Sequence, residues 1–220
     1  MTGAGPEVLS ADGLARRYHY RDVFRDVSLA LSRGRCLLLR GANGAGKTSL
    51  LEVLAGLARP ARGTVRLREV PVADWGPAQR RAVAYLPHQP PAYRGLTASE
   101  NCVFFGRLYG GEAVETRTAA LLERVGLAAH RDRPVRQFSR GMLQRYGLAL
   151  ALLFGPAVLL LDEPFTALDP DGCETLRGLL AEEKARGTAL LLVSHQGELV
   201  GGLADGALRL EGGALTEEGA

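Results

Sequence analysis

The segment GANGAGKTS at residues 41–49 places a lysine and two hydroxyl side chains directly after a glycine-rich run. It matches the pattern Gly-x-x-x-x-Gly-Lys-Ser/Thr, in which backbone N–H groups converge on phosphate oxygens. In this pattern the ammonium of Lys47 reaches the β- and γ-phosphates of a nucleotide, and the Thr48 hydroxyl ligates Mg²⁺. The segment therefore predicts a nucleotide site made by Gly41, Ala42, Asn43, Gly44, Ala45, Gly46, Lys47, Thr48 and Ser49.

A second chemical signal is the acidic pair in AVLLLDEP, residues 157–164. Asp162 and Glu163 follow a run of apolar residues that predicts a buried strand, and ligands of open α/β sheets lie at such strand ends. In a chain that also has a phosphate loop, the pair indicates that Asp162 holds Mg²⁺ and that Glu163 deprotonates the attacking water. The alternative is a solvated strand end, which is common for a single acid.

Two further polar residues follow short apolar runs. His195 comes after ALLLV and Ser194, at a third predicted strand end, and Gln89 lies in AYLPHQPP after a short strand-like stretch. A lone histidine is more often structural than catalytic, so neither residue identifies a site alone. The 27 basic residues include two lysines only, Lys47 and Lys184. Lys184 lies in the charged run AEEKARG, where a solvated face explains it, whereas Lys47 suggests a place that requires a compact ammonium.

The bulk composition excludes several classes of protein. The chain has 220 residues, of which 46% are hydrophobic, enough for one domain with a real core. No apolar run approaches the roughly 20 residues that a membrane span needs, and the N-terminus resembles no export signal. The three cysteines are widely spaced, which favours packing roles in a reducing cytoplasm over disulfides or zinc. A net charge of +3 is slight for a nucleic-acid binder.

The elements that must position these residues can be predicted from the hydrophobic pattern. Residues 8–14 and 27–31 read as an N-terminal antiparallel β piece, with another strand at 63–70. A strand at 36–39 precedes the glycine-rich turn and a helix at 49–57 follows it. The runs at 157–161 and 189–193 predict strands of a mostly parallel core sheet, buried on both faces. Residues 90–150 predict a helical insert, and the tail EGGALTEEGA is expected to be loose.

The order of the motifs identifies a family resemblance. GANGAGKTS, Gln89, FSRGM at 138–142, LLLDEP, ALD at 167–169 and SHQ at 194–196 resemble the ATP-binding cassette (ABC) ATPase subunits over nearly the whole chain. The resemblance implies a single P-loop NTPase domain of the ABC-ATPase fold, residues 1–220, with the helical subdomain inserted at about 90–150. It implies two subunits that hold ATP and Mg²⁺ between them, head to tail, and an integral-membrane transporter partner at the cytoplasmic face of the membrane.

The same resemblance assigns roles to individual residues. Tyr18 would stack on adenine, with Tyr20 as a second candidate. Glu163 would be the general base, and His195 would contact the γ-phosphate. Ser139 and Gly141 would complete the site of the other subunit, with Asp169 at the dimer seam. The Mg²⁺ ligands would be Thr48, Gln89 and Asp162, with Gln89 also near the hinge that couples hydrolysis to transport.

The cargo is less sharply indicated. The stretches HQPPAYRGLTASENCVF, LDEPFTALDPDG and LLLVSHQ are similar to the haem-exporter ATPases of cytochrome c biogenesis, the CcmA family. The competing interpretation is another small exporter of lipids, antibiotics or other hydrophobic compounds. A third possibility is a non-transport ABC ATPase that acts on nucleic acid or ribosomes. Haem itself is not expected to bind this chain, which has no CxxCH attachment motif.

Overall fold

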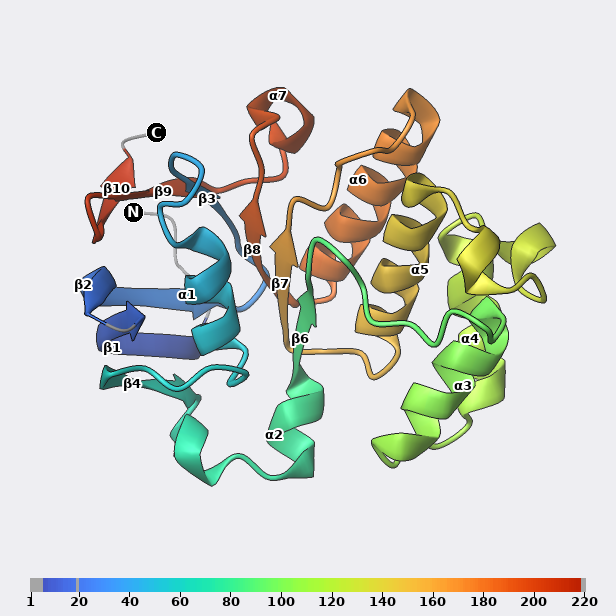
Figure 1. Ribbon diagram of the computed structural model, residues 1–220, viewed down its shortest axis with the longest axis horizontal. Coiled ribbons are helices and arrows are strands. Elements are labelled where there is room, and N and C mark those ends of the chain that lie inside the picture. Colours follow the sequence, from blue (N-terminus) through green and yellow to red (C-terminus); the bar gives the residue numbers. More distant parts are fainter. Residues whose placement is uncertain (1–5, 19, 219–220) are drawn as a thin grey trace.

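The N-terminal part of the molecule is a four-stranded antiparallel sheet. The structure, a computed structural model, describes residues 6–18 and 20–218 (Figure 1). The strand order is β2-β1-β4-β5. The predicted strands at 8–14, 27–31 and 63–70 all fall in this sheet, but the last is broken by Arg68, whose φ of 54° starts a turn. The strands are β1 (Glu7–Tyr18), β2 (Arg21–Ser32), β4 (Arg62–Leu67) and β5 (Val70–Pro71).

The second sheet carries six strands in the order β10-β9-β3-β8-β7-β6. The five strands from β9 to β6 are parallel, and β10 pairs with β9 in the antiparallel sense. The parallel core predicted from the apolar runs is therefore confirmed. The strands are β3 (Cys36–Arg40), β6 (Val83–Leu86), β7 (Val158–Asp162), β8 (Ala189–Val193), β9 (Gly206–Glu211) and β10 (Ala214–Glu218).

The expectation of a loose tail is wrong for the part of it that the structure describes. Ala214–Glu218 forms β10, and its last residue, Glu218, accepts hydrogen bonds from Arg40 (3.0 Å) and Arg209 (2.6 Å). The sequence did not indicate this strand because most of its residues are polar. Residues 219–220 lie outside the described residues.

Strands β7 and β8 separate two hydrophobic cores. Leu159 and Leu161 of β7 belong to the core under the helices, while Val158 and Leu160 face the core shared with the antiparallel sheet. Because strand side chains alternate between faces, a strand buried on both sides must be apolar at every position. This confirms the interpretation of the two continuous apolar runs.

The helices lie on different sides of the core sheet (Figure 1). One, α1, begins at the phosphate loop, and its Leu50, Leu51, Val53 and Leu54 lie in the core beside the antiparallel sheet. Three helices, α3 to α5, form the helical part predicted at about 90–150, away from the antiparallel sheet. The described helices are α1 (Lys47–Leu54), α2 (Pro77–Ala82), α3 (Ala98–Leu108), α4 (Val114–Arg124), α5 (Arg140–Leu152), α6 (Pro170–Ala185) and α7 (Gly197–Val200).

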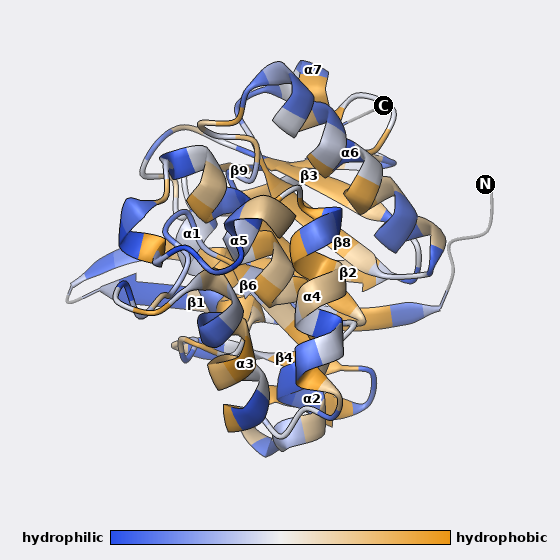
Figure 2. Ribbon diagram, turned by 90° about the vertical axis from the view of Figure 1, so that its right-hand side faces the viewer, coloured by the Kyte–Doolittle hydropathy of each residue, from blue (hydrophilic) through white to orange (hydrophobic). Residues whose placement is uncertain are grey.

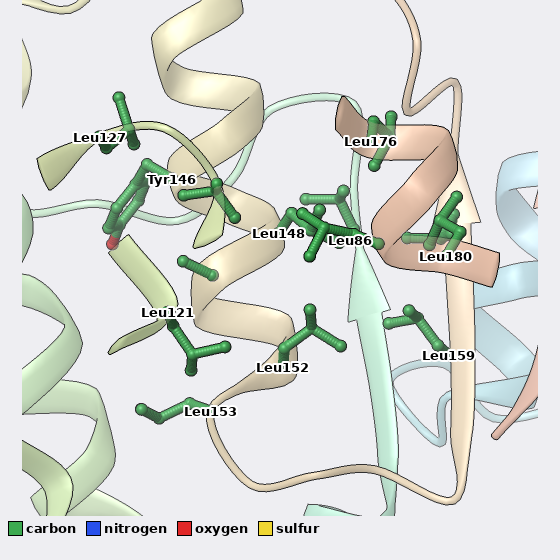
Figure 3. Close-up of a cluster of buried hydrophobic side chains, with 14 of the residues drawn as sticks. Leu86, Leu121, Leu127, Tyr146, Leu148, Leu152, Leu153, Leu159, Leu176 and Leu180 are labelled. Atoms are coloured by element: carbon green, nitrogen blue, oxygen red, sulfur yellow. The ribbon is translucent and has the colours of Figure 1, made fainter. Parts of the chain in front are cut away.

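Helix α5 joins the helical part to the core sheet (Figure 3). Its Tyr146 and Leu148 are buried in one cluster with Leu86 of β6, Leu159 of β7 and Leu176 of α6. The apolar residues concentrate in the sheet strands and on the inner helix faces, with polar residues outside (Figure 2). Among the described residues, no helix combines the length and the apolar character needed to cross a bilayer.

Candidate nucleotide site

The glycine-rich loop wraps around the ammonium of Lys47. This buried side chain donates hydrogen bonds to the carbonyl oxygens of Gly41 (2.8 Å) and Ala42 (3.0 Å). Gly46 precedes α1 with a φ of 101°, and a Cβ there would lie 2.5 Å from Val23. Only glycine tolerates both conditions, so the loop brings backbone N–H groups to the start of a helix, where anions bind.

The Thr48 hydroxyl lies against the end of β7. It donates a 2.7 Å hydrogen bond to the carboxylate of Asp162, which is buried. The two predicted Mg²⁺ ligands are thus adjacent, and their hydroxyl and carboxylate oxygens are the hard donors that Mg²⁺ prefers. No group of three or more His, Cys, Asp or Glu residues that could hold a metal occurs among residues 6–18 and 20–218. Thr48 and Asp162 therefore suit a Mg²⁺ ion whose remaining ligands come from phosphate and water.

Glu163 is held in an unusual backbone conformation at the mouth of the same strand. Its φ is 53°, and its N–H donates to the carbonyl of Val193 (3.0 Å). The backbone N–H of His195 donates a hydrogen bond to Oε2 of Glu163 (3.4 Å). The imidazole Nε2 of His195 lies 3.3 Å from Oε1 of Glu163, but the two atoms are not aligned for a hydrogen bond. The buried Oε1 thus has no hydrogen-bond partner within the described chain, which leaves it able to accept a proton from a bound water.

An open cleft connects these groups. It is lined by Tyr18, Val23, Asn43, Gly44, Gly46, Lys47, Thr48, Ser49, His88, Asp162, Glu163, Thr166, Val193, His195 and Gln196. Ala42 and Ala45 line the adjoining hollow beside the turn between β9 and β10. Most of the residues predicted from the motifs are therefore brought together by the fold.

The aromatic residue of the cleft is Tyr18, whereas Tyr20 is fully exposed and does not line it. The Arg16 guanidinium lies 4.6 Å from the centroid of the Tyr18 ring. Hydrogen bonding to Arg16, with a smaller contribution from Ser49, holds the pKa of the Tyr18 hydroxyl below its usual range. Of the two tyrosines considered for stacking on adenine, the geometry favours Tyr18.

Gln89, which is expected to serve Mg²⁺, is not among the residues that line the cleft. Its neighbour His88, to which the sequence assigned no role, lines the cleft instead. Pro90 directly after Gln89 packs against Gly147 of α5, so close that a Cβ on that glycine would lie 2.3 Å from the proline ring. This contact holds the segment against α5.

The FSRGM segment at residues 138–142, called the signature segment below, is not among the residues that line the cleft and lies at the start of α5. The Ser139 hydroxyl accepts a hydrogen bond from the N–H of Met142 (3.2 Å) and so caps the helix. A Cβ on Gly141 would lie 2.7 Å from the carbonyl oxygen of Ala167, so the absence of a side chain lets these two backbone segments approach closely. Asp169 caps α6 through Gly172 (3.1 Å) and pairs with Arg145 of α5 (3.2 Å).

The comparison with known families agrees with this geometry. Residues 24–166 match the family model described as ABC transporter. The chain belongs to the ABC transporter family. The chain is the ATP-binding domain of an ABC transporter, and its enzymatic activity is the hydrolysis of ATP. A solved ATP-binding subunit of an ABC transporter has a TM-score of 0.88 and 30% identity, and the match covers 96% of this chain and 89% of that one.

Several curated relatives of this ABC domain are similar over most of its length. The chain is 42% identical over 187 residues to the cytochrome c biogenesis ATP-binding export protein CcmA of Methylococcus capsulatus (85% of this chain, 90% of that protein). It is 32% identical over 188 residues to the lantibiotic transport protein SrtF of Streptococcus pyogenes (86% and 80%). It is 38% identical over 190 residues to YxlF of Bacillus subtilis, an uncharacterised ABC transporter ATP-binding protein. That match covers 86% of this chain and 62% of YxlF, so the chain spans less than two thirds of that relative.

Proposed function

We propose that this chain powers an exporter by hydrolysing Mg-ATP between two head-to-tail copies of its site, at the cytoplasmic face of the membrane. The observation that carries the proposal is the meeting of Lys47, Thr48, Asp162 and Glu163 in one cleft that lacks Ser139 and Gly141. One chain holds the phosphate loop and the acidic pair, and the signature segment of a second chain would close the site. A closure that needs ATP makes hydrolysis depend on assembly.

The residues divide the work of phosphoryl transfer. Lys47 and the loop N–H groups bind the phosphates, and Tyr18 stacks on the base. Thr48 and Asp162 would hold Mg²⁺, which when bound neutralises charge on the phosphate oxygens. Glu163 accepts a proton from the water that attacks the γ-phosphorus, and the bond from that phosphorus to the oxygen of ADP breaks. His195 lies beside Glu163 and orients the same water or contacts the γ-phosphate.

The cargo proposed is haem for the assembly of c-type cytochromes. Support comes from the similarity to CcmA, at 42% identity over 90% of that protein, and from the HQP and SHQ segments. The second candidate is export of a peptide antibiotic or another hydrophobic compound, which the 32% identity to SrtF favours. In both cases the cargo binds an integral-membrane partner rather than this chain.

The test is to purify the chain with its membrane partner in lipid and measure ATP hydrolysis against candidate cargoes. Stimulation by haem and not by a lantibiotic supports the first cargo, and the reverse result supports the second. A chain that co-purifies with nucleic acid in a salt-sensitive manner, and with no membrane protein, would contradict transport altogether.

A further inference from the structure

The ring of Tyr18 has an arginine against one of its faces. The guanidinium carbon of Arg16 lies 4.6 Å from the ring centroid. The Nε of Arg16 is buried and has no hydrogen-bond partner among the described residues, whereas Tyr18 is 45% exposed. A buried guanidinium against an exposed ring places the ring on the outer side, with its second face open. Such stacking is favourable because the guanidinium is planar and its charge is attracted to the π electrons.

The guanidinium is held from below by the loop that follows α1. Its Nη1 donates a hydrogen bond to the carbonyl oxygen of Arg59 (2.5 Å). The same loop is fastened to β1 beside this contact, where the N–H of Ala61 donates to the carbonyl oxygen of Ala15 (2.7 Å). Since α1 begins at the phosphate loop and this segment follows its end, Arg16 connects the tyrosine ring to the helix that carries the phosphate-binding residues.

Strand β1 is irregular at the same residue. Its pairing with β2 shifts between Leu14 and Arg16, and again between Arg16 and Arg17. Such bulges redirect side chains and are frequent beside functional sites. The neighbouring arginine has a different partner, because Arg17 is exposed and pairs with Asp22 of β2 (2.7 Å). Of the two adjacent arginines, one therefore contacts the ring and the other contacts the next strand.

We propose that Arg16 is a positioning residue for the nucleotide base, and that it fixes the Tyr18 ring in the orientation in which the base stacks on the open face. The inference rests on the proposed function, since it needs ATP in this cleft with its base on Tyr18. An exposed side chain loses freedom when a ligand orders it, and this loss reduces affinity by about two- to tenfold. A ring that is already held by Arg16 avoids most of that loss.

The test separates the contribution of the base from that of the phosphates. A non-hydrolysable ATP analogue and tripolyphosphate, which has no base, are each titrated with Mg²⁺ into the whole chain by calorimetry, and the ratio of the two affinities is compared. The ratio should fall about tenfold in Tyr18→Ala, which removes the stacking platform, and about three- to fivefold in Arg16→Ala. Arg17→Ala, which removes an adjacent arginine, is the matched control and should leave the ratio unchanged.

A double substitution shows whether Arg16 acts through the ring. If it does, Arg16→Ala has no further effect on the ratio once residue 18 is alanine. An unchanged affinity for tripolyphosphate shows that each variant is folded.

Three results would overturn the inference. One is an equal weakening of both ligands in Arg16→Ala, which is the sign of a purely structural or charge effect. Another is a fall in the ratio that persists in the Tyr18→Ala background, because Arg16 would then contact the base itself. The third is an unchanged ratio in Arg16→Ala or in Tyr18→Ala.

Failure of the proposed function gives a different pattern. Lys47→Ala serves as the reference, because it removes the cation of the phosphate loop and should weaken both ligands. If it does so and Tyr18→Ala lowers the ratio while Arg16→Ala does not, only the assignment of Arg16 fails. If Lys47→Ala leaves both affinities unchanged, the cleft is not the nucleotide site, and both proposals fall.

Discussion

The Thr48 hydroxyl donates a 2.7 Å hydrogen bond to Asp162, which lies 114 residues away in the sequence. This bond joins the start of α1 to the end of β7, and it holds the two oxygens that we propose as Mg²⁺ ligands next to each other. Thr48→Val should remove most of the gain in ATP affinity that Mg²⁺ provides, about tenfold, with little change in EDTA. Thr48→Ser keeps the hydroxyl and is the control. Equal Mg²⁺ dependence in Thr48→Val and the wild type would contradict the ligand role.

Lys47 should contribute to nucleotide binding rather than to folding. Its hydrogen bonds go to Gly41 and Ala42 of its own loop, so Lys47→Ala leaves the core unchanged. We expect ATP affinity to fall at least tenfold because a charge-assisted contact is lost, while urea unfolding shifts little. Titration of a fluorescent ATP analogue checks the first part. An unchanged affinity would argue against the phosphate loop as the binding site.

Glu163→Gln tests the general base. The variant keeps the shape of the side chain and removes its ability to take a proton, so ATP binding should persist while turnover falls at least about a hundredfold. With ATP present the variant should accumulate as a dimer, measured by light scattering. Turnover near the wild-type rate in the assembled transporter would remove Glu163 from this role.

Gly147 should be intolerant of any side chain. A Cβ there would lie 2.3 Å from Pro90 and 2.6 Å from Leu86, so Gly147→Ala should destabilise the fold by about 1–3 kcal/mol. Gly178, in the middle of α6 with nothing within 4 Å, is the matched control. There alanine should stabilise by about 0.5–1 kcal/mol through helix propensity. Urea unfolding measures the free energy of unfolding of both variants. Similar changes in the two would show that Pro90 moves aside easily for a Cβ at position 147.

Asp205 should make part of the stability dependent on pH. Partial burial alone would raise its pKa, but hydrogen bonds from Lys184 (2.9 Å) and the Cys36 N–H (2.8 Å) hold the pKa below its usual range. A carboxyl with a depressed folded pKa stabilises above its unfolded pKa of about 3.9, and this contribution is lost as pH falls through the folded value.

Asp205→Asn should therefore cost about 1–3 kcal/mol at pH 7, and the cost should shrink below about pH 3.9. Urea unfolding at pH 7 and near pH 3 measures both values. Asp132→Asn is the control, because Asp132 is exposed and pairs only with its neighbour Arg131 among the described residues. A cost for Asp205→Asn that does not change with pH would rule out the ionised carboxylate as its cause.

Local motifs carried most of what could be predicted from the sequence. The loop at 41–49 requires glycine at position 46, because that residue has a positive φ. The loop motif is made of consecutive residues, so it can be recognised in the sequence. The strands before Asp162 and Ser194 are apolar at every position because both faces are buried, so they too are visible locally. The positions of Lys47, Thr48, Asp162 and Glu163 could therefore be predicted from the loop and the strands alone, without the rest of the fold.

Contacts between distant segments could not be predicted in this way. Lys184 looked like part of a solvated charged run, but its ammonium donates to the carbonyl of Leu203 (2.8 Å) and to Asp205. Pro90 likewise packs against Gly147 of α5, a residue far from it in the sequence. Neither partner can be read from neighbouring residues.

The polar strand β10 has a practical consequence for anyone who handles this protein. It covers the edge of β9, and Glu218 fastens it to Arg40 and Arg209. A version cut before Ala214 would uncover the backbone of β9, and uncovered strand edges recruit other chains. Shortened preparations should therefore aggregate even though their nucleotide-binding residues are intact. A purification tag is better placed at the N-terminus, or joined after Ala220 through a flexible spacer.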